Sequence, residues 1–474
     1  MVPSRMTQVG FAVLGALLCA STAHAAEWIN PVAGNWTDGT KWSTGSEPTS
    51  TDPAVFPDSG SFIVTVTGFH DAKSLSVTAP TVRFSGTAGN RIIDLVNDLF
   101  VNGGTIDLDD MVVIKAGDTG VGAIRVRSGA TINVQTASAL WGDRLNIGEA
   151  GTGTDNAINL IGGQLTTKDT SGTNNFIGRS GSTGRLVLSA SATANFAHTI
   201  GMADSASNNS KGYLDVLTNS TLTARGILIA TRGIPGQDAR LTVSGSGSLA
   251  EQDAWGNDLT IGAASNSTGE LLVSSSGRFE TAPFGQVTVH NTGAITLTSG
   301  GQFDLRSNML IDGGLFTGSA AGLNFVDTGV GSAVGIDIRN GGKLDLTSSL
   351  IYTDDAAITL ADTASELEVT NFIVHTSITA DTGSIIDVDT LSVHEGAVTA
   401  ADTGTTIDVA GDLSIGSPDV GSRLVTIEND AIATIGDDLY VGRQPTISPD
   451  RHPFARRAAY SPARMPHETR KAKI

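Results

Sequence analysis

Aspartate is the residue type in this sequence with the clearest capacity for chemistry. Paired carboxylates act as general acid and base, and clustered carboxylates bind Ca²⁺. Two repeated motifs, Gly-Gly-x-x-Asp-Leu and Ala-Asp-Thr, hold Asp107, Asp304, Asp345, Asp362, Asp381 and Asp402. A catalytic pair is a local exception, whereas these aspartates recur with the repeat. The glycine-aspartate nonapeptide of repeated calcium sites is also absent. The pattern therefore favours solvated turn and strand-face residues over a catalytic or calcium site.

Histidine is the second candidate for chemistry. His375 and His394 each lie in a matched position of neighbouring repeats, so we expect a stacked, exposed pair on the surface. A metal site is disfavoured because no third ligand has a suitable spacing. The other histidines considered, which stand alone without a Ser or Asp partner in a usable motif, are His70, His198 and His290.

Glycine-rich segments resemble catalytic loops only superficially. Residues 244–247 (Ser-Gly-Ser-Gly) lack the following helix that a nucleophile elbow requires. The paired glycines lack it as well, so they do not form a phosphate-binding loop. We therefore predict no catalytic, cofactor or metal site, and no enzymatic activity.

Three tryptophans, Trp28, Trp36 and Trp42, cluster near the start of the chain among Gly, Asn and Pro. Such rings stack on sugars or cover the open end of a β-structure. We expect the second role, because the first coil of an array needs a large apolar cover. Trp141 and Trp255 each precede a glycine and are expected to fill corners.

The elements that carry these residues are short strands in repeats. Gly-Gly-x-aliphatic/aromatic begins at Gly103, Gly162, Gly300, Gly313 and Gly341. An aliphatic-Gly pair followed by a polar loop, Gly and a strand occurs after residues 177 and 261. The three rungs that contain Ala-Asp-Thr align over their length, with Val369, Val388 and Val409 in the same place.

Repeats of about 20–30 residues have a direct physical interpretation, since two or three short strands with their turns make one coil of a parallel β-solenoid. Inward residues then stack into aliphatic ladders, and Thr, Ser and Asp face solvent. Gly and Asn supply the left-handed backbone of tight corners. We therefore predict an all-β fold, a right-handed parallel β-helix or related solenoid.

Composition supports this prediction and excludes other classes. The 474 residues include 57 glycines, with only 5% aromatic and 16% charged residues, which is unusual for a compact α/β enzyme. The 39% of hydrophobic residues argues against disorder. The net charge of −19 is the sum of −25 in residues 1–442 and +6 in residues 443–474, so the body should repel nucleic acid and anionic membranes.

The two ends of the chain differ from its body. Residues 1–25 resemble a secretory signal, with Arg5, an apolar stretch at 9–20 and a small-x-small site at 23–25, so the mature chain is expected to begin at Ala26. Cys19 falls inside this signal. Residues 443–474 hold eight Lys or Arg and two acidic residues, and are either a disordered basic tail or a frameshift product. Between the ends we predict a Trp-containing cap at 26–77 and solenoid repeats at 78–442.

The signal, the Trp- and Gly-rich opening and the Ile-Gly…Thr-Gly-x-Leu-x-Val repeats resemble autotransporter-type passengers and exported proteins with autotransporter-associated β-strand repeats. The resemblance covers residues 1–442, and it implies a β-solenoid exported to the cell surface. It stops at the C-terminus, where neither the strands of a membrane barrel nor a hydrophobic sorting tail is present.

The functional expectation is a class of role. We expect a secreted or surface-exposed structural or interaction protein, adhesin-like and monomeric, that contacts a surface partner through many weak contacts. The alternative is a β-helix that binds or cleaves a polysaccharide. A fibrous trimer is a third class, and sedimentation as a monomer would remove it.

Overall fold

The structure is a computed structural model that describes residues 25–29, 33–87, 91–117, 121–149, 154–168, 174–204, 206–253, 257–263, 265–319, 322–326, 334–353, 357–394, 396–416, 423–441 and 471–472. The predicted signal peptide except Ala25, and Trp255, lie outside this set. Of the predicted basic tail, only Lys471 and Ala472 lie within it. The boundaries predicted for the four segments of the chain stay predictions.

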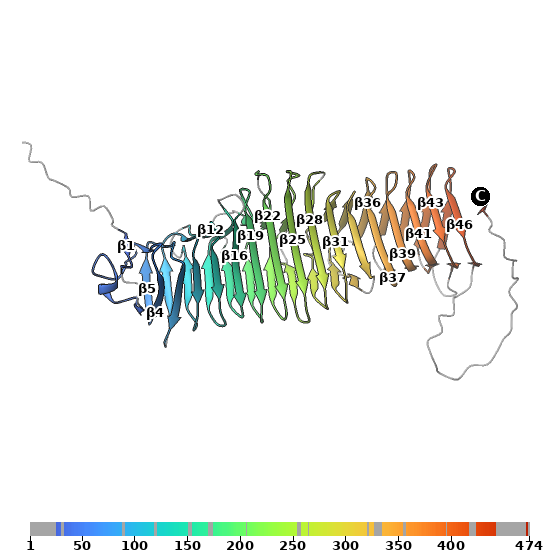
Figure 1. The fold of residues 1–474 in the computed structure, drawn as a ribbon. Helices are drawn as coiled ribbons and strands as arrows, with labels where there is room; N and C mark the ends of the chain where they lie inside the picture. The colour runs from blue at the N-terminus through green and yellow to red at the C-terminus, as the bar shows by residue number, and fades with distance from the viewer. Residues whose placement is uncertain are drawn as a thin grey trace, which may run out of the picture.

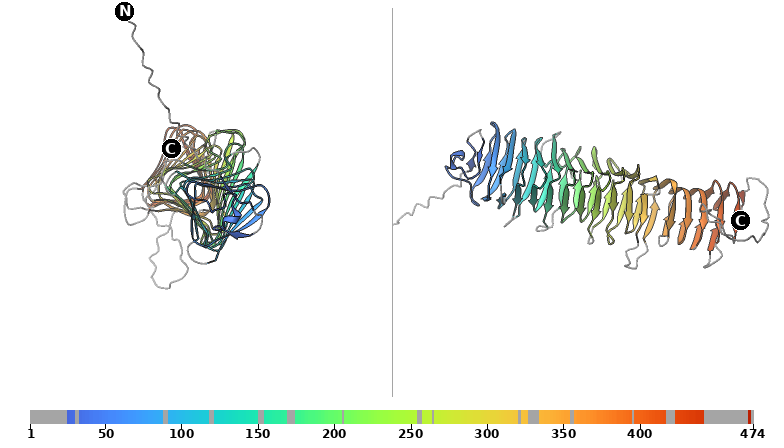
Figure 2. Two further views of the ribbon diagram at one scale, coloured as in Figure 1. Left: turned by 90° about the vertical axis from the view of Figure 1, so that its left-hand side faces the viewer. Right: turned by 90° about the horizontal axis from the view of Figure 1, so that it is seen from below.

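The described part of the chain is an elongated parallel β-helix, seen from the side in Figure 1 and along its length in Figure 2. Its strands form three parallel sheets, called here the first, second and third sheets, and successive strands along the chain belong to successive sheets. The predicted all-β solenoid is confirmed. A 3₁₀ turn, η1 (Gly39–Lys41), follows the first two strands.

The first sheet contains β1 (Ala26–Glu27), β3 (Pro53–Phe56), β6 (Ser74–Val77), β9 (Leu99–Asn102), β12 (Ala123–Arg127), β15 (Arg144–Ile147), β18 (Asn175–Ile177), β21 (Ile200–Met202), β24 (Ile227–Ile229), β27 (Leu259–Ile261), β30 (Val287–His290), β33 (Met309–Asp312), β36 (Gly335–Arg339), β38 (Ala357–Leu360), β40 (Ser377–Ala380), β42 (Gly396–Ala400) and β45 (Arg423–Ile427).

The second sheet contains β2 (Gly34–Asn35), β4 (Ser61–Val66), β7 (Thr81–Gly86), β10 (Thr105–Leu108), β13 (Thr131–Val134), β16 (Asp155–Ile161), β19 (Thr183–Ser189), β22 (Lys211–Leu217), β25 (Gln237–Ser244), β28 (Ser267–Ser274), β31 (Gly293–Leu297), β34 (Leu315–Ser319), β37 (Lys343–Thr353), β39 (Glu366–Val374), β41 (Ile385–Val393), β43 (Thr406–Val409), β44 (Leu413–Ile415), β46 (Ile432–Ile435), β47 (Leu439–Val441) and β48 (Lys471–Ala472).

The third sheet contains β5 (Phe69–Ala72), β8 (Ile92–Leu95), β11 (Val113–Ala116), β14 (Ala139–Gly142), β17 (Gln164–Thr167), β20 (Thr193–Phe196), β23 (Thr221–Ala224), β26 (Leu249–Gln252), β29 (Arg278–Glu280), β32 (Gln302–Leu305) and β35 (Leu323–Phe325). It ends at β35. Beyond this strand, each coil contributes two stretches to the second sheet. These stretches are the two halves of one long strand, as in β39, or two short strands, as in β43 and β44.

The coil length varies along the molecule, in the three-sheet coils and in the two-sheet coils alike. Side chains hydrogen-bonded between neighbouring coils lie 26 positions apart at Asp107–Asn133 and Asn133–Asn159. The corresponding spacing is 19 positions at Asn371–Thr390. Both spacings agree with the predicted repeat of about 20–30 residues.

Inward side chains stack in register along the axis, because alternate residues of a strand point to the same side and each strand pairs with its equivalent in the next coil. The predicted alignment is confirmed, since Val369 pairs with Val388 and Val388 with Val409. All three side chains are buried. One continuous apolar core therefore runs along the molecule.

Corners are made where the sequence predicted them. The first glycine of each Gly-Gly pair has a positive φ, as at Gly103 (82°) and Gly341 (73°). The second glycine lies against the previous coil, and a Cβ on Gly104 would stand 2.0 Å from the carbonyl oxygen of Ala79. These positions therefore require glycine for two separate reasons, conformation and space.

A second corner device accompanies the Ala-Asp-Thr repeats. Ser365, Ser384 and Thr405 are buried one above another, three positions after each aspartate of the motif. Ser365 Oγ donates to the carbonyl of Ala361 at 2.6 Å, and Thr405 Oγ1 donates to that of Ala401 at 2.6 Å. Each hydroxyl thus donates a hydrogen bond to a carbonyl of its own corner.

Candidate functional site

The recurrent aspartates do not form one ladder. Asp107 on β10 and Asp345 on β37 lie in the second sheet, whereas Asp304 on β32 lies in the third. Asp362 and Asp402 are exposed at corners with positive φ, as expected of turn residues. Asp304 is only 2% exposed, so its interpretation as a solvated residue is wrong. Its burial has a specific cause, described next.

Asp304 belongs to a cluster of two carboxylates and two guanidinium groups on the outer face of the third sheet. Its backbone pairs in register with Glu280 on β29, and the side chain of Glu280 is 8% exposed. Arg278 Nε donates to Asp304 Oδ2 at 2.6 Å, and its Nη2 lies 3.0 Å from Glu280 Oε1. Arg306 Nη2 lies 2.5 Å from Glu280 Oε2. We call Arg278, Glu280, Asp304 and Arg306 the four-charge cluster.

The charged groups of the cluster have hydrogen-bond and ion-pair partners. Asn324 Nδ2 donates to Asp304 Oδ1 at 2.8 Å, which occupies the second carboxylate oxygen. Burial alone would lower the pKa of Arg278, but the hydrogen bond and charge of Asp304, with the charge of Glu280, raise it above its ordinary value. The buried carboxylates are therefore paired and hydrogen-bonded, as buried charges must be.

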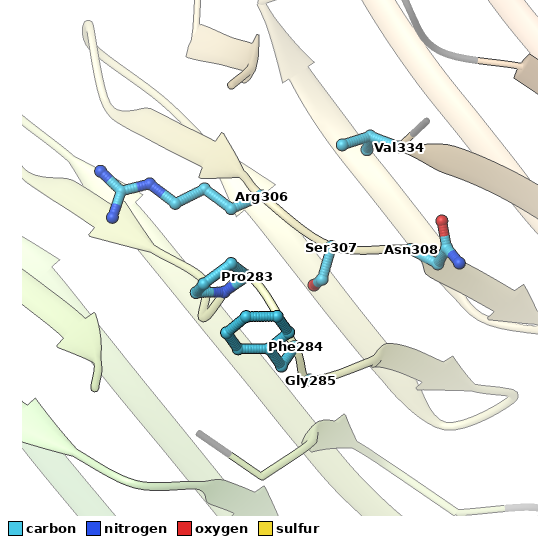
Figure 3. A pocket seen from close by; sticks show the side chains of 7 residues that line it. All are labelled: Pro283, Phe284, Gly285, Arg306, Ser307, Asn308 and Val334. Carbon is cyan, nitrogen blue, oxygen red and sulfur yellow. The ribbon is translucent and has the colours of Figure 1, made fainter. Parts of the chain in front are cut away.

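A small cavity of about 210 Å³ lies beside the cluster, at the corner between the third and first sheets. Figure 3 shows its lining from two neighbouring segments and one further residue: Pro283, Phe284, Gly285, Arg306, Ser307, Asn308 and Val334. Phe284 is 61% exposed, whereas Ser307 is 6% exposed and its Oγ has no hydrogen-bond partner. Arg306 lines the cavity and also belongs to the four-charge cluster.

The arrangement suits binding better than proton transfer. A general acid or base must exchange a proton with a substrate, and it needs a group within hydrogen-bond reach that is free to do so. Glu280 and Asp304 are instead held by two guanidinium groups and an amide. The exposed parts are the ring of Phe284 and the half-exposed Arg278, and such groups contact a ligand without changing its bonds.

A second polar patch lies on the second sheet. Arg185, on β19, stacks over the ring of Tyr213, on β22, with Cζ 5.3 Å from the ring centre. The Tyr213 hydroxyl donates to Asp238 Oδ2 at 2.6 Å, and burial together with this carboxylate raises the pKa of Tyr213 to about 12. A shallow depression of about 330 Å³ adjoins these residues and Arg240. These contacts join successive coils.

An acidic column occupies the outer face of the second sheet in later coils. Asp345, Glu368, Asp387 and Asp408 pair in register from β37 to β43. Burial, then the charge of Glu368, raises the pKa of Asp345 above its ordinary value. Burial and the charge of Asp408 do the same for Asp387. No group of three or more potential metal ligands is found among the described residues.

The histidine predictions hold in part. The rings of His375 and His394 are 5.2 Å apart, so the two residues lie together as expected, but the rings are tilted by 56° and both are half-buried. Two histidines treated as isolated have carboxylate neighbours that the sequence did not indicate. His290 Nδ1 lies 3.2 Å from Asp312 Oδ2, and His70 Nδ1 lies 3.3 Å from Glu47 Oε2. Burial lowers the pKa of His70 against the opposing charge of Glu47.

The tryptophans separate into two environments. Trp28, Trp36 and Trp42 are at most 1% exposed and pack edge to face, with Trp42 5.0 Å from each of the other two. They pack against core residues of the first coils, so they cannot stack on a sugar. Trp141 lies on the outer face of β14 with Lys115 Nζ 5.0 Å from its ring centre, so the prediction of a corner filler is wrong.

Comparisons of the chain with protein families, with curated proteins and with solved structures found no match. Within the described ranges, no helix is long and apolar enough to cross a membrane. The described chain is a parallel β-solenoid built from coils of two or three strands.

Proposed function

We propose that this chain is a secreted or cell-surface structural and interaction protein, an adhesin-like passenger of the autotransporter type. The observation that carries the proposal is the continuity of the outer faces. Outward side chains pair with their neighbours in the next coil, as in the hydrogen-bonded run Asp107, Asn133 and Asn159. A long, regular surface of this kind suits many weak contacts with one extended partner.

Export is the first part of the proposal to test. A bacterium expressing the full chain is fractionated, and intact cells are treated with protease. We expect the mature chain to begin at Ala26 and to be released into the medium or cleaved on intact cells. Retention of the uncleaved chain in the cytoplasm would contradict both the export and the surface role.

The alternative function is polysaccharide binding or cleavage, and the four-charge cluster with its cavity is the observation that favours it. The ring of Phe284 offers an apolar face to a sugar ring, and Arg278 offers donors to hydroxyl or carboxylate groups. A panel of neutral and uronate polymers separates the two functions. If the chain is a surface protein without enzymatic activity, we expect no cleavage of any polymer in the panel. Cleavage that is lost in Arg306→Ala would instead establish that the chain is an enzyme.

Binding without cleavage needs its own control. Phe284→Ala is compared with Phe69→Ala, since Phe69 on β5 is similarly exposed at 56% but lies far from the cluster. A binding site at the cavity predicts loss of polymer retention only in Phe284→Ala. Equal behaviour of the two variants would remove the cavity from consideration.

A further inference from the structure

Arginine side chains gather on one outer face of this acidic body. Phe100, Arg125, Asn146 and Phe176 pair in register on the successive first-sheet strands β9, β12, β15 and β18, so their side chains point to the same outer side. Alternate residues of the same strands share this side. We call the surface the arginine face, and its members used below are Phe100, Arg125, Arg127, Arg144, Phe176 and Arg179.

Aromatic rings hold the guanidinium groups on this face. The Cζ atoms of Arg125 and Arg127 each lie 5.5 Å from the centre of the Phe100 ring. Arg179 follows β18, and its Cζ lies 4.4 Å from the centre of the Phe176 ring. Both rings are half-buried and keep part of their surface accessible. Cation–π contacts of this kind orient a guanidinium group without neutralising its charge.

The charge of the face is positive because its cations outnumber their carboxylate partners. Asp98 and Glu149 both pair with Arg125. Among the described residues no ion pair is found for Arg127, Arg144 or Arg179. The Nε atoms of Arg127 and Arg144 also lack a hydrogen-bond partner. A ligand oxygen can therefore bind these guanidinium groups without breaking an ion pair that the fold already uses.

The arrangement fits an anionic sugar polymer. A guanidinium group matches a carboxylate in shape and charge, and it can donate two parallel hydrogen bonds to it. Arg127, Arg144 and Arg179 come from three successive coils, so they can meet carboxylates that recur along one chain. The two phenylalanine rings offer apolar surface to the C–H groups of sugar rings. The acidic remainder of the body is screened beyond about 8 Å at physiological salt.

We propose that the arginine face binds a carboxylate-bearing polysaccharide that lies along the axis of the solenoid, with its carboxylates on Arg127, Arg144 and Arg179. The inference rests on the proposed role as a surface interaction protein and names the chemistry of the partner. It concerns a different surface from the four-charge cluster, which lies on the third sheet.

Retention of the full chain on immobilised polygalacturonate, at about 0.15 M salt, tests the proposal. The test variant is Arg127→Gln/Arg144→Gln/Arg179→Gln. The matched control, Arg83→Gln/Arg185→Gln/Arg240→Gln, removes the same charge from exposed arginines of the second sheet. We expect the affinity of the test variant to fall roughly 10-fold or more, and that of the control to stay within about 2-fold of the unmodified chain.

Thermal melts of both variants establish that they are folded, since they change side chains on the outer face. If the test variant melts early, Arg179→Gln alone is compared with Arg240→Gln. Immobilised neutral dextran should not retain the unmodified chain, and polyphosphate should retain it less than polygalacturonate does. These results together support the proposal.

Three outcomes overturn it. Equal loss of affinity in both triple variants assigns the attraction to overall charge. Equal retention on polyphosphate, lost in the same test variant, identifies a surface for anions in general. Absence of retention on polygalacturonate removes the proposed ligand, whereas the export experiment still decides the surface role, so the two failures are distinguishable.

Discussion

The coils up to β35 and the coils from β36 onward share the same parallel ladders but balance their outer charges differently. In the earlier coils, opposite charges meet across coils, as in the four-charge cluster and in Arg125 with Asp98 and Glu149. In the later coils, like charges stack in the acidic column, with Lys343 as the cation placed between Glu366 and Glu368. The comparison teaches that the inward ladder specifies the fold, whereas the outward ladder is free to vary in charge.

The largest expected effect contrasts the two regions at their cores. Phe303→Ala in the earlier coils removes a ring stacked 5.5 Å from Phe279, and we expect it to cost about 3–5 kcal/mol. Leu439→Ala in the last coil should cost less than about 1 kcal/mol, because more than half of Leu439 is already exposed. Local opening free energies from hydrogen exchange measure both. Similar costs at the two sites would contradict the distinction.

The second prediction concerns the sign of the change in local stability when a carboxylate is removed. Asp304→Ala leaves Arg278 without its closest partner, and we expect a loss of about 1–3 kcal/mol in local stability. Asp387→Ala removes a repelling member of the acidic column, so the protection of β39 and β41 should stay equal or rise. Hydrogen exchange at neutral pH compares them. Destabilisation by both variants would show that the Asp387 carboxylate makes stabilising contacts that outweigh its repulsion within the acidic column.

The third prediction is a pH dependence confined to the later coils. The pKa values of Asp345 and Asp387 are raised above 3.8, so the folded state binds protons more strongly than the unfolded state. Stability of β37–β41 should therefore rise as the pH falls through the raised pKa values, towards 3.8. Hydrogen exchange, corrected for its intrinsic pH dependence, measures this change.

Asp387→Asn supplies the variant for that pH experiment. It removes one of the two titrating groups and should reduce the dependence. Asp155→Asn, on β16 in the earlier coils, is the matched control and should leave it unchanged. A pH dependence that is equal in both variants would assign the effect to other groups.

The smallest effect is expected for a partly exposed ion pair. Lys343 Nζ lies 2.5 Å from Glu368 and 3.2 Å from Glu366, with about a third of its side chain exposed. Lys343→Met should cost about 0.5–1 kcal/mol, since exposed pairs contribute little. Arg185→Met, which loses a 3.4 Å contact to Asp215, is its counterpart in the earlier coils. A thermal melt of each variant is sufficient to rank them.

The fold was predictable because its determinants are local. Alternating aliphatic residues, paired glycines and the aligned Val369, Val388 and Val409 each specify one strand or one corner, and repetition adds the coils. The proximity of His375 and His394 followed from the same alignment. Turn chemistry and periodicity are thus enough to predict a solenoid.

The candidate site was less predictable because its determinants are not local. The same motif puts Asp107 and Asp304 on different sheets, since loop lengths vary between coils and the motif does not specify its place in the coil. The side-chain partners of the buried Asp304 come from other coils: Arg278 from the preceding coil and Asn324 from the following one. Trp141 was misplaced for a related reason, because a following glycine does not distinguish a corner from a strand end.

The direction of the backbone hydrogen bonds has a mechanical consequence. These bonds join one coil to the next, so they run along the axis of the helix. A pull on the two ends loads the coils in series, and the coil with the weakest contacts opens first. The buried tryptophans resist at one end, whereas the exposed last coil yields at the other. Under tension the molecule would unwind one coil at a time from its C-terminal end and lengthen in small steps.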